Sequence, residues 1–170
     1  MQKNTFKELG IHSNIIKALS ECGIKEPTDI QKQAIPIIKS GKDIIGKSKT
    51  GSGKTAAFGI PLLDSLKPSG RVKALVLVPT RELAIQISGE FEKFGKHTDL
   101  KFATVFGGVS MFNQIKAIKK ADIVIGTPGR ILDHLNRKTL RLSELTHFVL
   151  DEADRMVDMG FIKDIEKILR

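Results

Sequence analysis

Two short elements of this 170-residue chain carry residue types that handle phosphate and magnesium. The first is Gly51–Thr55, where glycines let backbone N–H groups converge on phosphate oxygens. Lys54 would reach the β- and γ-phosphates, and the Thr55 hydroxyl would ligate Mg²⁺. In the second element Asp151 would hold Mg²⁺, while Glu152 would orient or deprotonate an attacking water. The pair predicts a nucleotide-hydrolysing site whose catalytic residues are Lys54, Asp151 and Glu152.

These elements need a scaffold that brings strand ends and helix starts together. Short β-branched runs alternate with helical patterns along the chain, which predicts a mostly parallel sheet flanked by helices. Ligands of such sheets bind at the carboxyl ends of the strands. The expected strands cover residues 43–46, 74–78, 102–106, 122–126 and 147–151. The expected helices cover residues 13–22, 28–40, 54 onward, 82–96, 111–119, 130–136 and 162–169.

The phosphate loop is expected between the first strand and the helix that begins near Lys54. The usual pattern opens with Gly or Ala, and here Ser48 occupies that position, a small departure because Ser is also small. A glycine-rich turn without a ligand is the alternative interpretation. For the acidic element the alternative is an ordinary polar strand end, which the presence of Lys54 and Thr55 disfavours.

Composition points to an anionic partner. The net charge is +9 and the sequence pI is about 9.7, which favours nucleic acid over a merely lysine-rich surface. Trp and Tyr are absent, so we expect contacts with the nucleic-acid backbone rather than a row of stacked bases. Cys22 is the only cysteine, which makes a reducing cytoplasm the default. The apolar runs are too short for a membrane span, and the histidines lack metal-ligand spacing.

Four further motifs occur in a fixed order with these two. They are Gly23–Gln31 with Phe6 upstream, Pro79–Ala84, Gly107-Gly108 and Thr127–Arg130. With all six elements, the chain resembles the DEAD-box ATP-dependent RNA helicases almost end to end. The resemblance implies a RecA-like P-loop NTPase domain that binds ATP, Mg²⁺ and RNA. Residues 58–62 and 127–134 are similar to bacterial helicases of the ribosome-assembly branch.

The resemblance also assigns the nucleotide-binding residues. Gln31 would read the adenine edge, and Phe6 would cover the ring face. Thr28 and Gln31 also have the spacing of a helix capping box, which is compatible with that role. Mg²⁺ would lie on Thr55 and Asp151. The residues expected to contact ATP are Phe6, Lys25, Pro27, Gln31, Lys49, Thr50, Gly51, Ser52, Gly53, Lys54, Thr55 and Ala56.

The remaining motifs are expected at the carboxyl ends of strands, where Arg, Thr and loop amides can hold RNA phosphates. Taken singly, such motifs are also ordinary helix starts with Thr as the cap. The resemblance implies that Asp154 couples the nucleotide to RNA. The residues expected to contact RNA are Pro79, Thr80, Arg81, Gly107, Gly108, Thr127, Pro128, Gly129 and Arg130.

The expected organisation is a helical region over residues 1–42 that carries the adenine motif, followed by an incomplete RecA-like domain over residues 43–170. The family's Ser-Ala-Thr strand is expected after Arg170, between the phosphate-loop strand and the strand before Asp151. The second RecA-like domain, which supplies arginines to the phosphate, is absent from this sequence. We therefore expect an ATP-dependent RNA helicase whose isolated first domain is nearly inactive. The alternatives are a stand-alone nucleotide- or RNA-binding module without turnover and, less favoured, a DNA translocase.

Overall fold

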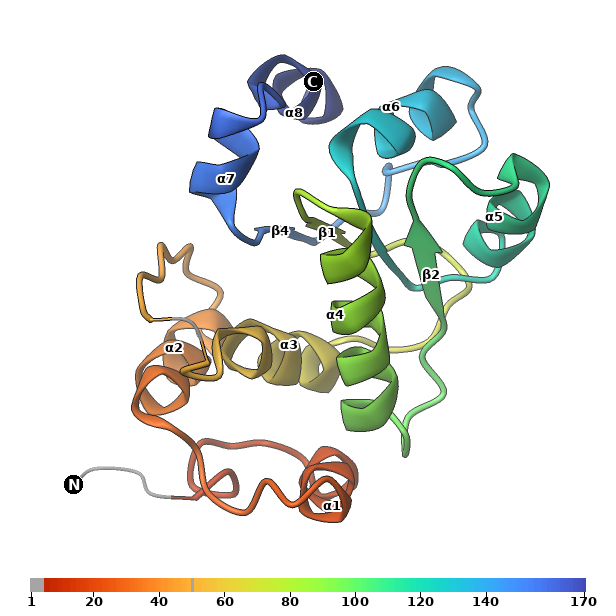
Figure 1. Ribbon diagram of the computed structural model, residues 1–170. Coiled ribbons are helices and arrows are strands. Elements are labelled where there is room, and N and C mark those ends of the chain that lie inside the picture. Colours follow the sequence, from red (N-terminus) through yellow and green to blue (C-terminus); the bar gives the residue numbers. More distant parts are fainter. Residues whose placement is uncertain (1–4, 50) are drawn as a thin grey trace. The chain divides into compact units, whose positions relative to one another are not determined.

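The computed structural model of the chain describes residues 5–49 and 51–170, and its elements alternate as an α/β fold requires (Figure 1). The strands are β1 (Ala74–Leu77), β2 (Phe102–Val105), β3 (Ile123–Gly126) and β4 (His147–Leu150). The helices are α1 (Ser13–Glu21), α2 (Asp29–Lys39), α3 (Lys54–Ser65), α4 (Arg81–Phe94), α5 (Met111–Ile118), α6 (Pro128–Asn136), α7 (Ala153–Asp158) and α8 (Ile162–Ile168). None of the helices in these ranges has the length and hydropathy of a membrane span.

The four strands form one parallel sheet in the order β2-β3-β1-β4. Their register aligns the last residues of all four, because Leu77 pairs with both Gly126 and Leu150, and Val105 pairs with Gly126. The loops that follow these strands therefore leave from one edge of the sheet. The predicted parallel α/β architecture is confirmed, and four of the five predicted strands match within one residue at each end.

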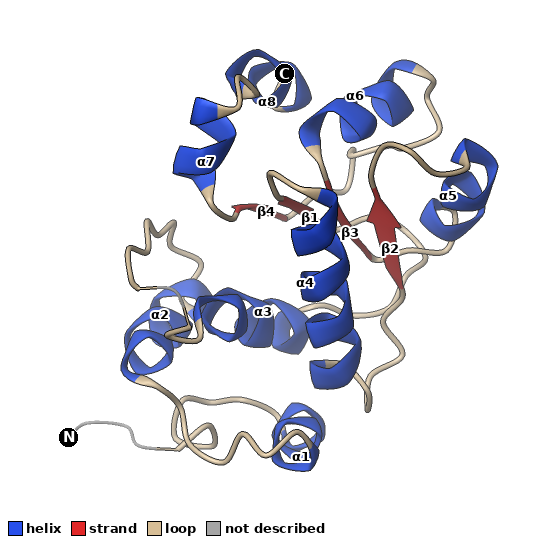
Figure 2. Ribbon diagram, viewed as in Figure 1, coloured by secondary structure: helices blue, strands red, loops and turns tan. Residues whose placement is uncertain are grey.

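The strand predicted over residues 43–46 is wrong. This segment is drawn as a loop in Figure 2, and no described residue pairs with it as a strand. Ile44 is 39% exposed and Ile45 is 101% exposed, so neither side chain is buried in a core. Two adjacent isoleucines favour the extended conformation, but a strand also needs a neighbouring backbone to receive its hydrogen bonds.

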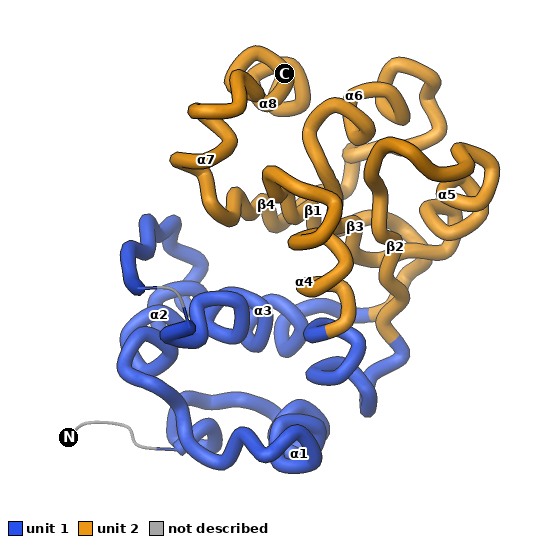
Figure 3. Tube along the Cα trace, in the orientation of Figure 1, with its two compact units in different colours: residues 1–67, 90–99 blue, residues 68–89, 100–170 orange. Residues whose placement is uncertain are grey.

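The chain divides into two compact units, shown in Figure 3. Unit 1 comprises residues 1–67 and 90–99, and unit 2 comprises residues 68–89 and 100–170. The domain boundary expected after residue 42 stays a prediction.

Helices form the body of unit 1. Helix α2 packs along α3, and α1 also contacts α3. A Cβ at Gly59 would lie 2.6 Å from a ring carbon of Phe91, so only glycine allows this close approach of α3 to the Phe91 ring. The buried Asp64 carboxylate accepts hydrogen bonds from the backbone N–H of His12 at 2.7 Å and from Lys39 Nζ at 2.5 Å. These two hydrogen bonds connect the start of α1 and the end of α2 to α3.

The sheet and the helices after it form the core of unit 2. One face carries Leu75, Leu77, Val105 and Val124, which pack with Ile118, Ile131, Met156 and Ile168 from α5 to α8. In β1 and β3 the intervening residues point to the opposite face and are also buried, as expected for the central strands of a parallel sheet with helices on both sides.

At the amino end of the strands, the fully buried Asp122 carboxylate holds the connecting loops. It accepts hydrogen bonds from the N–H groups of Ser69, Gly70 and Lys101 at 2.6–2.9 Å. These bonds compensate the burial of its charge.

Candidate functional site

Two predicted nucleotide motifs are in direct contact within unit 1. The Gln31 side chain is 3% exposed, and its Nε2 donates to the carbonyl of Gly53 at 3.2 Å. The Thr28 hydroxyl donates to the carbonyl of Ser52 at 3.0 Å. These bonds connect residues 22 and 24 positions apart in sequence, and they attach the phosphate loop to the start of α2.

The capping-box interpretation of Gln31 is confirmed. Its Oε1 accepts from the Thr28 N–H at 3.0 Å, as the box requires at the start of α2. A carboxamide has two N–H donors and two acceptor lone pairs, and these two bonds use one of each. One donor and one acceptor are therefore not used by these bonds, but at 3% exposure Gln31 presents almost no surface to a base in this structure.

Glycine is required at the turn into α3. Gly53 precedes the helix at φ 89°, a left-handed conformation that an L side chain rarely adopts. A Cβ there would also lie 2.5 Å from Gln31 Nε2. Ser48 occupies the position where this sequence differs from the usual pattern. Its hydroxyl oxygen lies 2.7 Å from the hydroxyl oxygen of Ser52, so a hydrogen bond joins these two side chains.

The other residues predicted to contact ATP differ in their exposure. Phe6 is 2% exposed, so its ring is packed in the protein and presents almost no surface to a ligand in this structure. Thr50 lies outside the described residues. Lys25, Lys49 and Gly51 are exposed, Ser52, Lys54 and Thr55 are half-buried, and Pro27 and Ala56 are buried. Lys54 and Thr55 lie in the first turn of α3, where the free helix N–H groups favour an anion.

The acidic element lies in unit 2 at the carboxyl end of β4. The Asp151 N–H donates to the carbonyl of Leu77 at 3.0 Å, so strand pairing continues through Asp151 itself. The chain then turns at Glu152, which adopts φ 52° and ψ 48° and precedes α7. A left-handed non-glycine residue costs of order 1 kcal/mol and is often found at functional positions.

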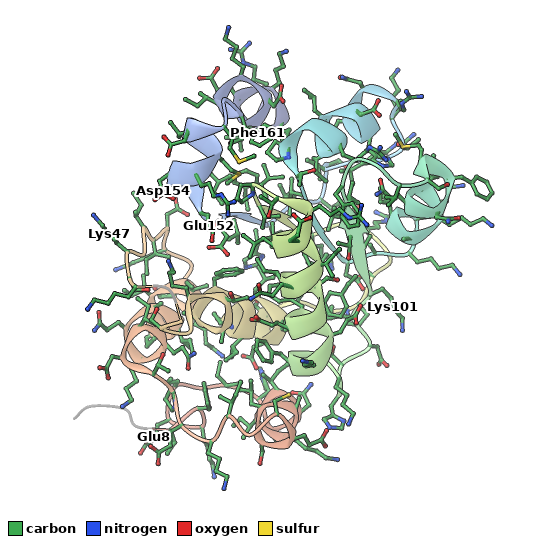
Figure 4. The ribbon with its side chains drawn as sticks, in the orientation of Figure 1. Glu8, Lys47, Lys101, Glu152, Asp154 and Phe161 are labelled. Carbon is green, nitrogen blue, oxygen red and sulfur yellow. The ribbon has the colours of Figure 1, made fainter. Side chains whose placement is uncertain are left out.

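The acidic side chains around Glu152 interact with groups that are close in sequence. Its carboxylate accepts from Arg155 Nη1 at 3.2 Å, and the Asp151 carboxylate accepts from the Glu152 N–H at 3.1 Å. Asp154 is exposed and accepts from the Arg155 N–H. Figure 4 shows Glu152 and Asp154 near the start of α7. Asp151 and Glu152 are half-buried, which leaves carboxylate surface for an oxygen-loving cation or a water.

The predicted RNA motifs gather along the same edge of the unit 2 sheet. The Thr80 hydroxyl accepts from the Leu83 N–H at 3.3 Å and caps the start of α4, as the helix-start interpretation anticipates. Pro79 is buried before it. The guanidinium of Arg81 lies 5.0 Å above the Phe106 ring, and Arg81 Nη1 lies 3.9 Å from where a Cβ of Gly108 would be. Arg81 thus lies beside the turn at Gly107-Gly108.

The last motif begins at the end of β3. Gly126 has no room for a side chain, because a Cβ would lie 2.2 Å from the Val105 carbonyl oxygen. Thr127 then precedes α6, and Pro128 occupies its first turn, where a missing N–H costs nothing. Gly129 is exposed. Arg130 Nη1 donates to the carbonyl of Val109 at 3.1 Å, which connects this motif to the Gly107-Gly108 turn.

This edge therefore presents two arginines, exposed glycine amides and two carboxylates. Such an arrangement suits an extended anion beside a magnesium-bound phosphate. Two polar residues that sequence patterns did not reveal also belong to it: Gln114 and His134 are buried beneath the loops. Their only sequence signal is their place on the apolar faces of α5 and α6, four and three residues from Ile118 and Ile131.

Comparisons with known proteins find relatives over almost the whole chain. Residues 28–170 match the family described as DEAD/DEAH box helicase. The chain is 50% identical over 165 residues to the probable ATP-dependent RNA helicase MJ0669 of Methanocaldococcus jannaschii. It is 52% identical over 167 residues to the DEAD-box ATP-dependent RNA helicase CshA of Bacillus cereus. These alignments cover 96% and 97% of this chain but only 45% and 32% of the two relatives.

Solved structures agree in fold. A DEAD box protein from the hyperthermophile Methanococcus jannaschii superimposes with a TM-score of 0.96 at 48% identity, covering 99% of this chain and 47% of the other. A hypothetical ATP-dependent RNA helicase from Sulfolobus tokodaii gives a TM-score of 0.87 at 42% identity, covering 94% of this chain and 46% of that one. The chain thus spans less than half the length of each of these proteins.

Proposed function

Because this chain belongs to the DEAD/DEAH box helicase family, we propose that it is the ATP- and RNA-binding N-terminal RecA-like domain of an ATP-dependent RNA helicase. The observation that carries the proposal is the bond from Gln31 to the Gly53 carbonyl. It attaches the adenine motif to the phosphate loop and uses only one of the two donors of the amide, which is almost fully buried in this structure. A purely structural cap would not need a contact with this loop.

In the proposed mechanism the motif residues hold the phosphates, the magnesium ion and the attacking water. The loop N–H groups and Lys54 hold the phosphates, and Glu152 orients or deprotonates the attacking water. The oxygen ligands of Thr55 and Asp151 match the preference of Mg²⁺, which would neutralise charge on the phosphate oxygens when bound. The ion pair with Arg155 would hold Glu152 ready in its left-handed turn.

The proposed RNA interface is the carboxyl edge of the unit 2 sheet. Arg81, Arg130 and the amides of Gly107-Gly108 would hold backbone phosphates without reading bases. Thr80 and Thr127, at helix starts, would add hydroxyl and amide donors, and Asp154 would couple this surface to the nucleotide. The positive net charge supports such a partner.

The whole protein would couple ATP hydrolysis to local RNA unwinding in the cytoplasm, with a second RecA-like domain facing this one. That domain would supply arginines, which are worth on the order of 10³–10⁵ in rate. A Ser-Ala-Thr strand of the longer protein would give residues 43–46 the backbone partner that no described segment provides. We retain the division into residues 1–42 and 43–170 as part of the proposal.

Nucleotide selectivity tests the carrying observation. The chain should bind a fluorescent ATP weakly and in preference to GTP, and Gln31→Ala should abolish the preference. Gln33→Ala, which removes an exposed glutamine from the same helix, serves as the control. Equal binding of ATP and GTP by the unaltered chain would contradict the proposed role of Gln31.

ATP hydrolysis distinguishes an RNA helicase from a DNA translocase and from a binding module without turnover. We expect the isolated chain to hydrolyse ATP barely, with or without RNA, and the longer native protein to show RNA-stimulated hydrolysis that Glu152→Gln removes. Hydrolysis by the longer protein that DNA stimulates equally would favour a translocase. No turnover in the longer protein would favour a binding module.

A further inference from the structure

A buried carboxamide connects two of the segments proposed to contact RNA. Gln114 lies on α5 at 5% exposure, and its Nε2 donates to the Phe106 carbonyl at 2.9 Å. Its Oε1 lies 3.1 Å from Arg130 Nη1 and 3.0 Å from His134 Nε2. We call these three side chains, with the carbonyls of Phe106 and Val109, the Gln114 network.

The network has one consistent assignment of donors and acceptors. The Phe106 carbonyl can only accept and Arg130 can only donate, so Gln114 must present its nitrogen to the first and its oxygen to the second. That oxygen requires a proton on His134 Nε2. In the neutral ring Nδ1 is then an acceptor 2.8 Å from the Thr139 hydroxyl, whose single proton is divided between Nδ1 and the His134 carbonyl at 3.1 Å. Every polar atom of Gln114 and both ring nitrogens of His134 therefore have a neighbour within hydrogen-bond distance.

The neutral ring is what the surroundings favour. Burial is the main cause that lowers the pKa of His134, and the cations of Arg130 and Arg137 lower it further, while the Asp133 carboxylate opposes them. A neutral His134 avoids placing a second positive charge next to Arg130 in a buried site.

The two carbonyls of the network flank the glycine turn. Gln114 holds Phe106 on one side, and Arg130 Nη1 holds Val109 on the other. Gly108 between them is exposed at φ 82°, a conformation that would be free to change without these anchors. The same Gln114 oxygen fixes Arg130, so one side chain sets both the turn and the guanidinium.

We infer that Gln114 is a positioning residue that holds the Gly107-Gly108 turn and Arg130 together as one anion-binding unit, with His134 orienting its amide. The inference rests on the proposed RNA-binding function of this edge. Gln114 itself is buried and would not touch RNA. Preorganised donors bind an anion more tightly than donors that must be ordered on binding.

The first test replaces Gln114 by Met, which has similar volume but no hydrogen-bonding amide. We expect lower backbone NMR order parameters at Gly107, Gly108 and Val109, because the turn loses its anchors, and about tenfold weaker binding of a fluorescent single-stranded RNA, as expected for losing two or three buried hydrogen bonds. Asn113→Ala removes an exposed carboxamide from the same helix and should leave the order parameters unchanged and the RNA affinity within about twofold. Unchanged order parameters at Gly108 in Gln114→Met would overturn the inference.

A second pair of variants keeps the test decisive if Gln114→Met folds poorly. His134→Gln retains a donor near the Nε2 position, whereas His134→Leu removes it, so Gln should preserve the backbone order parameters at Gly108 and Leu should lower them. Equal behaviour of the two variants would contradict the role of His134. Absence of RNA binding by the unaltered chain would refute the proposed interface, and the order parameters would still decide the positioning role.

Discussion

The two units support the loops that we propose to bind anions by different means. In unit 2 the loops after β1, β2 and β3 and the turn at Asp151 leave strands whose register already aligns their ends. In unit 1 no strand among the described residues precedes the phosphate loop, and the side chains of Gln31 and Thr28 hold it instead. Backbone pairing thus positions one set of loops, and two side chains position the other.

The comparison implies that substitutions destabilise unit 2 most where its strands approach one another. Gly126→Ala should destabilise the chain by about 3 kcal/mol or more, because the added Cβ meets the Val105 carbonyl oxygen, which belongs to the backbone. Thermal unfolding would measure the loss. The control is Gly89→Ala in α4, where a Cβ meets nothing within 4 Å and should stabilise by about 0.5–1 kcal/mol.

Unit 1 should be most sensitive at the side chains that hold its loop. Gln31→Ala leaves the Gly53 carbonyl and the Thr28 N–H without their present partners and should cost about 1–3 kcal/mol. Amide exchange should increase at Ser52, whose N–H donates to the carbonyl of Lys49, but not at the buried Leu75 in unit 2. Equal acceleration in both units would show that the loops do not depend on separate supports.

The left-handed turn at Glu152 gives an effect of opposite sign. Glu152→Gly should stabilise the chain by about 1 kcal/mol, since glycine adopts φ 52° without the cost that a side chain adds. Glu152→Gln retains that cost and serves as the control in the same melting experiment. A destabilised glycine variant would show that the ion pair with Arg155 outweighs the backbone strain.

Moderate acid should weaken unit 2 first. Burial lowers the pKa of both His134 and His147 below 6.5, so the unfolded chain takes up these protons at a higher pH than the folded chain does. The stability that the neutral rings confer is present above pH 6.5 and is lost as the pH falls below it. Hydrogen exchange at Leu75 between pH 7 and 5 would show this, and His134→Gln should reduce the slope.

Unit 1 should respond only in stronger acid, and weakly. The side chains of Lys96 and His97 lower the pKa of Glu21 from 4.5 to about 2. The carboxylate is exposed, so the effect should be small and should shrink in high salt. Its contribution is present above pH 4.5 and lost as the pH falls towards 2. Glu21→Gln should remove the dependence, and a loss already at pH 6 would contradict this separation.

Much of the fold was predictable because local patterns and burial agree over most of the chain. The strands Ala74–Leu77 and Ile123–Gly126 are buried apolar runs, and glycines or polar caps mark most helix ends. Helix α7 was missed because six residues are too few to show a helical period. The strand prediction over residues 43–46 was wrong for another reason. Strand propensity does not supply the neighbouring backbone with which a strand must pair.

The site divides in the same way. Sequence alone was enough to propose the chemistry, because Lys54, Thr55, Asp151 and Glu152 are recognisable by type and spacing and their neighbours by the motifs around them. Tertiary structure alone decided which groups hold these motifs: the Gln31 bond to Gly53, the left-handed turn at Glu152 and the Gln114 network. Such contacts join residues distant in sequence, and their hydrogen-bond partners exist only once packing has brought them together.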